Sequence, residues 1–167
     1  VSAAEASSLN ERTEVWGACL YLAALFSQEA GSSDLTRFSG DDRFVADYLR
    51  SEHLSRLKPS VLQFLTRTSV VDRLCASLCD ALLDRSDSAR RLGALDEANL
   101  FLVPLDHRRE WYRYRHLFRD TLRAELDRLE PELGEVLHGR AAAWYEQNGR
   151  PEAAIEHMAA AGDIDEV

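Results

Sequence analysis

Apolar side chains return every third or fourth position along most of the chain, and this period predicts a mainly helical protein. Two amphipathic helices are expected at 10–28 and 43–57. Shorter helices are expected at 59–67, 74–83 and 88–99, with turns between them that are rich in β-branched or small polar residues.

Beyond residue 100 the period shortens to two, which is typical of β-strands. Two short strands are expected at 101–105 and 110–114, joined by a polar turn at 106–109. Pro104 has no N–H to donate to a ladder, so the hairpin is expected at the edge of a small sheet. Three short helices followed by a hairpin are the order of a winged helix.

The helical period then resumes. A helix that opens at His116 or Leu117 is expected to bury a stripe made of Phe118, Leu122, Leu126 and Leu129. Helices at 131–148 and 151–161 follow, each opened by a proline, and Asn148-Gly149 suits a left-handed helix cap between them. The last helix is expected to turn inward Ala154, Ile155, Met158 and Ala159.

The pair at 131–148 and 151–161 is rich in Ala, Trp and Tyr and resembles one unit of a tetratricopeptide-type (TPR-like) solenoid. One unit cannot bury both of its faces, so further repeats are expected after Val167. The chain also begins without Met. We therefore expect it to be a piece of a longer protein.

Composition and charge restrict the class of function. The chain has 167 residues and a net charge of −9, which disfavours nonspecific binding to DNA or to an anionic membrane surface. No apolar run approaches the roughly 20 residues that a membrane-spanning helix needs, and the first residues do not form a signal peptide. A cytoplasmic location is the expectation.

Catalytic and metal-binding motifs are not found in the sequence. It has no GxxxxGK[ST] phosphate loop, no GxSxG and no recognisable pair of catalytic carboxylates, so an enzyme is the least favoured class. The histidines and cysteines lack partners at ligand spacing, and no metal site is predicted. Cys75 and Cys79 are expected to be buried apolar thiols.

An arginine cluster is the strongest candidate for binding chemistry. Residues 107–128 contain seven arginines and four acidic residues, a local balance of 7 − 4 = +3. One interpretation is anion recognition by the hairpin and the following helix start, where free N–H groups already favour anions. The other is a solvated helix face. The candidates at the strand-to-helix junction are Arg113, Arg115 and His116.

Five segments resemble consecutive blocks of the MalT-like, LuxR-type transcriptional regulators, which are signal-transduction ATPases of the STAND class. They are TEVWGACLYLAAL (13–25), FSGDDRFVADYL (38–49), FLTRTSVVDRLCASLCDALL (64–83), LDEANLFLVPLDHRREWYRYRHLFRDTLRAEL (95–126) and LHGRAAAWYEQNGRPEAAIEHMAAAGD (137–163). Their order along the chain is the order in the family, and together they cover nearly all of it.

This resemblance implies three parts: the end of a nucleotide-binding region at 1–57, a winged helix at 58–129, and the first helices of a TPR-like array at 130–167. It also implies ATP or ADP bound to an upstream domain, a downstream sensor array, and an output domain that is either a DNA-binding helix-turn-helix or a kinase. Family members read YRYHHLF where this chain reads YRYRHLF, so Arg115 replaces the first histidine and His116 keeps the second. Which of the two would contact a nucleotide phosphate stays open.

The leading hypothesis is a non-catalytic regulatory module that relays nucleotide state from the ATPase domain to the sensor, with Arg113, Arg115 and His116 as a phosphate clamp. Two rivals differ in class. The first is a DNA-binding winged helix, although the helix at 88–99 offers only Arg90 and Arg91 as basic residues. The second is a protein-interaction scaffold built on the pair at 131–161.

Overall fold

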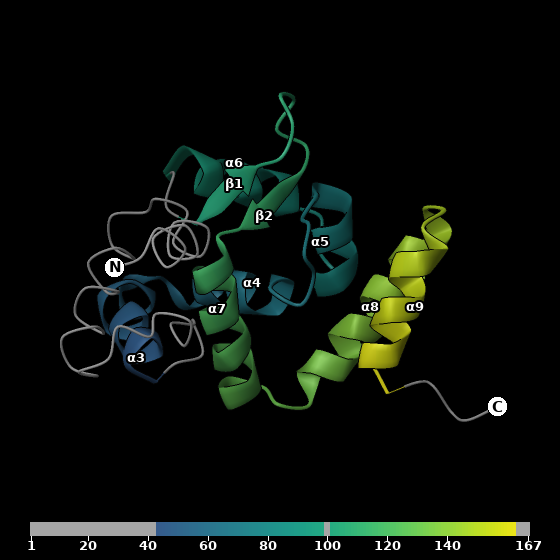
Figure 1. The fold of residues 1–167 in the computed structure, drawn as a ribbon. Helices are drawn as coiled ribbons and strands as arrows, with labels where there is room; N and C mark the ends of the chain where they lie inside the picture. The colour runs from purple at the N-terminus through teal and green to yellow at the C-terminus, as the bar shows by residue number, and fades with distance from the viewer. Residues whose placement is uncertain (1–42, 99–100, 163–167) are drawn as a thin grey trace, which may run out of the picture. The chain divides into compact units, whose positions relative to one another are not determined.

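The computed structural model describes residues 43–98 and 101–162, and the helix expected at 10–28 lies outside them. Contacts divide the chain into two compact units, one made of 1–58 with 115–121 and the other of 59–114 with 122–167. The domain boundaries expected near residues 58 and 130 stay predictions. Figure 1 labels the described helices and strands.

In the first unit, helix α3 (Arg43–Glu52) is followed by the 3₁₀ turn η2 (Leu54–Arg56). The prediction of one helix to residue 57 is therefore wrong. The Ser51 hydroxyl donates to the carbonyl of Tyr48 at 3.1 Å and the Ser55 hydroxyl to that of Ser51 at 2.6 Å. Such local bonds offer the backbone an alternative to the helical ladder.

The second unit begins with three helices, which are α4 (Pro59–Thr68), α5 (Ala76–Leu83) and α6 (Ser88–Ala98). Helix α5 packs against both of the others. Their shared core is almost completely buried and contains Phe64, Leu65, Leu78, Leu82 and Leu92. The Asp80 carboxylate accepts a bond from the Ser88 N–H at 3.1 Å and so caps the start of α6.

The antiparallel hairpin consists of β1 (Leu102–Pro104) and β2 (Tyr112–Tyr114), with Val103 opposite Arg113. Leu74 pairs with Tyr112 on the other side of β2 through two backbone bonds of 2.7 and 2.8 Å. The prediction that Leu74 begins a helix is therefore wrong, because its N–H and C=O are used by the strand. β1 takes the edge position that Pro104 requires.

Helix α7 (His116–Leu129) starts where the pattern predicts. Leu122 and Leu126 are buried, but Leu129 is 48% exposed, so its place in the buried stripe was wrongly predicted. After α7, the carboxylate of Glu130 accepts two bonds from the Arg67 guanidinium, at 2.6 and 3.0 Å, and this ties the end of α7 to α4.

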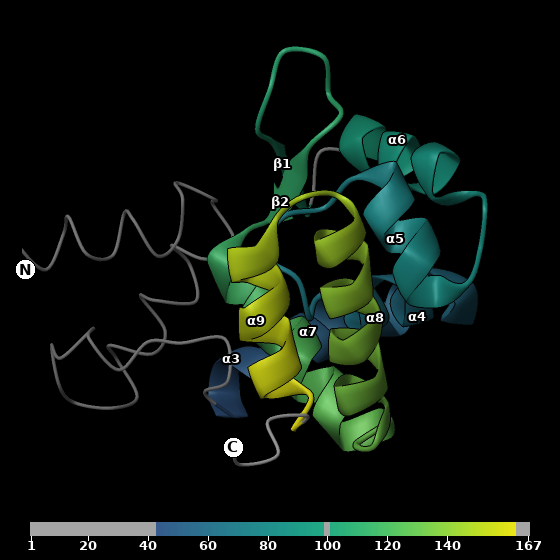
Figure 2. The ribbon, with the colours of Figure 1, turned by 90° about the vertical axis from the view of Figure 1, so that its right-hand side faces the viewer.

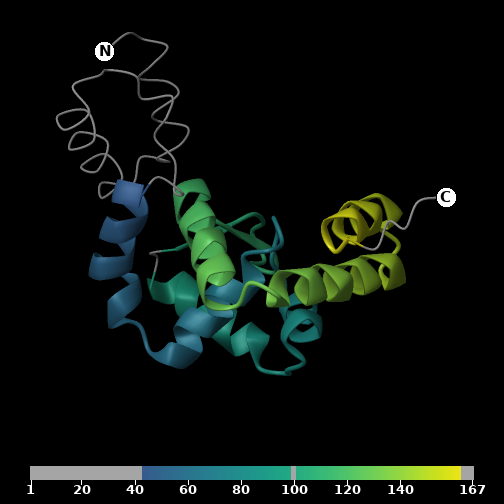
Figure 3. The same ribbon diagram turned by 90° about the horizontal axis from the view of Figure 1, so that it is seen from below.

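The last two helices, α8 (Leu133–Gln147) and α9 (Pro151–Ala160), lie side by side (Figures 2 and 3). Gly149 has φ +68°, which confirms the left-handed cap. Helix α8 also packs on α5, and the Arg140 guanidinium donates to the Leu82 carbonyl at 2.8 Å. Helix α8 begins at Leu133 rather than Pro131, because residues 131 and 132 form a turn.

The inward face predicted for α9 is only partly correct. Ala154 is buried, but Ile155 and Met158 are 62% and 44% exposed, and Ala159 is exposed as well. In the described part of the chain, no further element covers the side of α9 that carries them.

The predicted fold class is confirmed for the described residues: they are mainly α, with the helices and small two-stranded sheet of a winged helix followed by a pair of packed helices. Within residues 43–98 and 101–162, none of the helices is long and apolar enough to cross a membrane.

Candidate functional site

The hairpin is held in place by a buried hydroxyl pair. Tyr114 is 1% exposed, and its hydroxyl lies 2.6 Å from the hydroxyl of Thr68 in α4. Burial raises the pKa of Tyr114 well above its ordinary value. Tyr112 is buried on the same face of β2, so Arg113 between them falls on the more exposed face, as alternation predicts.

The three predicted site residues lie at the junction of β2 and α7. Arg113 is half-buried, and its guanidinium donates to the carbonyl of Tyr114 at 3.3 Å. Arg115 is half-buried, and its carbonyl accepts from the Arg119 N–H at 2.9 Å, which opens the helix. His116 is exposed as the first residue of α7.

The division into compact units passes between Tyr114 and Arg115, so Arg113 belongs to the second unit, whereas Arg115 and His116 belong to the first. The first turn of α7 contains no acidic residue. The start of an α-helix in general favours an anion over a cation. The role of the three residues as a phosphate clamp stays a prediction.

The turn of the hairpin is held by hydrogen bonds and an ion pair. The Asp106 carboxylate accepts from the N–H groups of Glu110 and Trp111, both at 3.0 Å, and these backbone bonds lower its pKa. Arg109 adopts φ +55°, and its guanidinium pairs with Asp96 of α6 at 2.7 Å. These bonds fix the point at which Trp111 leaves the turn.

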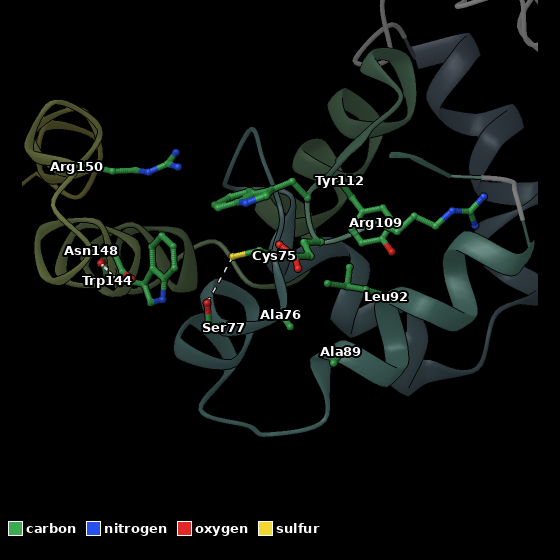
Figure 4. Close-up of a pocket in the computed structure, with 12 residues that line it drawn as sticks. Cys75, Ala76, Ser77, Ala89, Leu92, Arg109, Tyr112, Trp144, Asn148 and Arg150 are labelled. Atoms are coloured by element: carbon green, nitrogen blue, oxygen red, sulfur yellow. Dashed lines mark hydrogen bonds between the residues drawn. The ribbon is translucent and has the colours of Figure 1, made fainter. Parts of the chain in front are cut away.

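A cavity of about 570 Å³ lies beside the hairpin within the second unit (Figure 4). Its walls come from the start of α5, from α6, from the hairpin and from the loop between α8 and α9. The indole rings of Trp111 and Trp144 meet edge to face, with centroids 6.3 Å apart, and the Arg150 guanidinium lies 5.0 Å from the centre of the Trp111 ring.

Sequence reasoning did not find this cavity. Trp111 lies in the segment expected as the second strand and Trp144 in the helix expected at 131–148, and no local pattern joins residues 33 positions apart (144 − 111 = 33). The signal that was present is the repeated pairing of aromatic and arginine residues near both positions.

The predicted burial of the thiols is confirmed, since both Cys75 and Cys79 are buried. Burial raises the pKa of Cys79 far above its ordinary value, which keeps it a neutral thiol. Cys75 instead lines the cavity, with its sulfur 3.5 Å from the Ser77 hydroxyl. Among the residues that the structure describes, no three His, Cys, Asp or Glu side chains are grouped closely enough to hold a metal ion.

Comparison with known proteins identifies a family for the middle of the chain. A family model described as the MalT winged helix domain matches residues 50–134, about half of the chain, and the match includes the whole β2–α7 junction. The chain is 32% identical over 162 residues to the serine/threonine-protein kinase PknK of Mycobacterium tuberculosis (strains CDC 1551 / Oshkosh and H37Rv) and of Mycobacterium bovis. The match covers 96% of this chain but only 15% of those relatives.

Proposed function

Because the chain belongs to the MalT winged helix domain family, we propose that it is a non-catalytic regulatory segment of a longer LuxR-type signalling protein of the STAND class. In this proposal it relays the state of a nucleotide, bound by an upstream ATPase domain, to a downstream TPR-like sensor array. The small share of the matched relatives that the chain spans supports a role as one internal segment.

The relay residues in this proposal are Arg113, Arg115 and His116. The observation that carries it is the start of α7, a helix of 14 residues with exposed His116 at its first position and no acidic residue in its first turn. Bound ADP would supply phosphate oxygens, which are acceptors for such donors. Its release would remove the charge that holds the junction, and the protein would leave its resting state.

The output of the longer protein is part of the same proposal. The matched relatives are named serine/threonine kinases, so a kinase is one candidate output, and a DNA-binding helix-turn-helix is the other. Regulation would take place in the cytoplasm. The winged helix itself is not the DNA reader in this proposal, because Arg91 of α6 is already bound to Asp87 at 2.9 Å and packs over the ring of Phe64.

A second candidate function has support from one observation. Val136, Ile155 and Met158 are between 44% and 62% exposed on α8 and α9. Apolar residues exposed on a helix pair are typical of a surface that packs against a neighbour. Binding of a partner that survives deletion of residues 1–125 would favour this scaffold function.

The clamp is tested in the full-length protein with Arg115→Ala and His116→Ala. Each variant is expected to weaken ADP binding by about tenfold, the value of one charge-assisted bond, and to raise basal output. Arg90→Ala is the matched control, because Arg90 is highly exposed on α6. Unchanged ADP affinity and unchanged basal output in both variants would contradict the clamp. The isolated chain is expected to hydrolyse no ATP.

A further inference from the structure

We propose that the cavity between the hairpin and the α8–α9 loop binds a small planar aromatic anion, such as an aromatic carboxylate. The inference rests on the residues of the cavity and is independent of the phosphate clamp proposed above. Its volume of about 570 Å³ lies within the 300–1,000 Å³ of typical small-molecule sites.

The aromatic part of the ligand is indicated by the two indoles. Trp111 and Trp144 are both half-buried and meet at 71°, and Trp144 also packs against the ring of Tyr145 with centroids 5.3 Å apart. Two indole faces set at this angle form a corner that accepts a flat ring by stacking on one face and edge contact with the other. In the described part of the chain, neither indole N–H donates to a protein group.

The anionic part is indicated by an excess of donors. Arg150 is exposed, its guanidinium lies over the Trp111 ring, and Figure 4 shows its side chain extending toward the other lining residues. The guanidinium is a planar fork that matches a carboxylate. Opposite it, the first turn of α5 begins at Ala76 with no side-chain cap, so the N–H groups of Ala76 and Ser77 are unused by the helix.

The remaining charges do not cancel this preference. Arg109 also borders the cavity, but it is paired with Asp96, and its side chain extends away from the other residues (Figure 4). Glu110 is the one carboxylate among the lining residues, and it is exposed. Because Glu110 is exposed, its charge repels a bound anion only from the edge of the cavity. Neutralising Glu110 is therefore expected to change the binding affinity in the opposite direction from neutralising Arg150.

Binding is measured on the 167-residue chain by following the indole N–H signals of Trp111 and Trp144 in two-dimensional NMR, assigned with Trp→Phe variants. The probes are benzoate, phenylacetate and indole-3-acetate, each up to about 10 mM, since ligands of this size bind in the millimolar range or tighter. Benzyl alcohol is the neutral control. We expect at least one carboxylate to shift both signals and benzyl alcohol to bind several-fold more weakly.

Two variants test the assignment. Arg150→Gln is expected to weaken carboxylate binding by about tenfold and Glu110→Gln to strengthen it slightly, whereas Arg90→Gln leaves it unchanged. The proposal is overturned if no carboxylate shifts either indole signal, if benzyl alcohol binds as tightly as benzoate, or if Arg150→Gln binds like the wild type. None of these results bears on ADP binding, so this proposal and the clamp fail separately.

Discussion

The winged-helix core and the α8–α9 pair use apolar residues in opposite ways. In α4–α6, the large apolar side chains Phe64, Leu65, Leu78 and Leu82 are at most 2% exposed. In α8–α9, the buried residues include three alanines beside Leu137, His138 and Tyr145, while the large Ile155 is 62% exposed. An apolar stripe therefore has two meanings. It is covered where neighbouring elements of the same unit surround it, and it stays open on the side of α9 that, in the described part of the chain, no other element covers.

The largest expected effect is on stability, and it is tested by truncating one apolar side chain of the same size in each region. Leu82→Ala is expected to lower the free energy of unfolding by about 2–5 kcal/mol, because it leaves a cavity in a closed core. Ile155→Ala removes a side chain of the same size and is expected to cost less than about 1 kcal/mol, because water already reaches it. Urea unfolding measures both. Equal losses would contradict the difference between the two regions.

A smaller effect is expected from the hydrogen-bonded hydroxyls of Tyr114 and Thr68 inside the winged-helix core. Tyr114→Phe removes the 2.6 Å bond to Thr68 and is expected to cost about 1 kcal/mol at neutral pH. Burial raises the pKa of Tyr114, whereas an unfolded tyrosine titrates near 10, so the unfolded state releases this proton first and stability falls above about pH 10.

Tyr114→Phe should therefore flatten the alkaline loss of stability. It removes only part of it, because the pKa values of Tyr112 and Tyr145 are raised by burial as well. Unfolding curves between pH 8 and pH 11 test this, with Tyr48→Phe, at a half-exposed position, as the control. An alkaline slope that is the same in Tyr114→Phe and the wild type would be inconsistent with the buried hydroxyl pair.

The smallest expected effect concerns two histidines that contact each other between α8 and α9. The Nδ1 atoms of His138 and His157 are 2.8 Å apart, so one must donate and the other accept, and His157 also stacks on Tyr145. This bond and the stacking on Tyr145 are expected to make a small contribution to the stability of the two helices.

Hydrogen exchange of α8 and α9 at pH 7 measures this contribution, which is expected to be below about 1 kcal/mol. His157→Gln should lower the protection of both helices, and His107→Gln, at an exposed position of the hairpin turn, should not. If the two helices are protected equally in the wild type and in His157→Gln, the contact between the histidine rings does not contribute.

Local signals predicted the elements well. Proline at the start of α4 and α9, glycine at position 149 and the change of period near residue 100 all correspond to observed boundaries. The errors have physical causes. Leu74 was expected in a helix, but its backbone pairs with Tyr112, a residue 38 positions away (112 − 74 = 38). Periodicity reports local geometry and carries no information about such a partner.

The sequence by itself determined the fold class, the order of elements and the family, because helical period, turn residues and block order are all local properties of the chain. It also marked Arg113, Arg115 and His116 as candidates, through the residues that carry the family resemblance. Only the tertiary structure decided which apolar residues are covered and that Trp111, Trp144 and Arg150 form one cavity. Burial and convergence depend on contacts between residues far apart in sequence, and these exist only after the chain has packed.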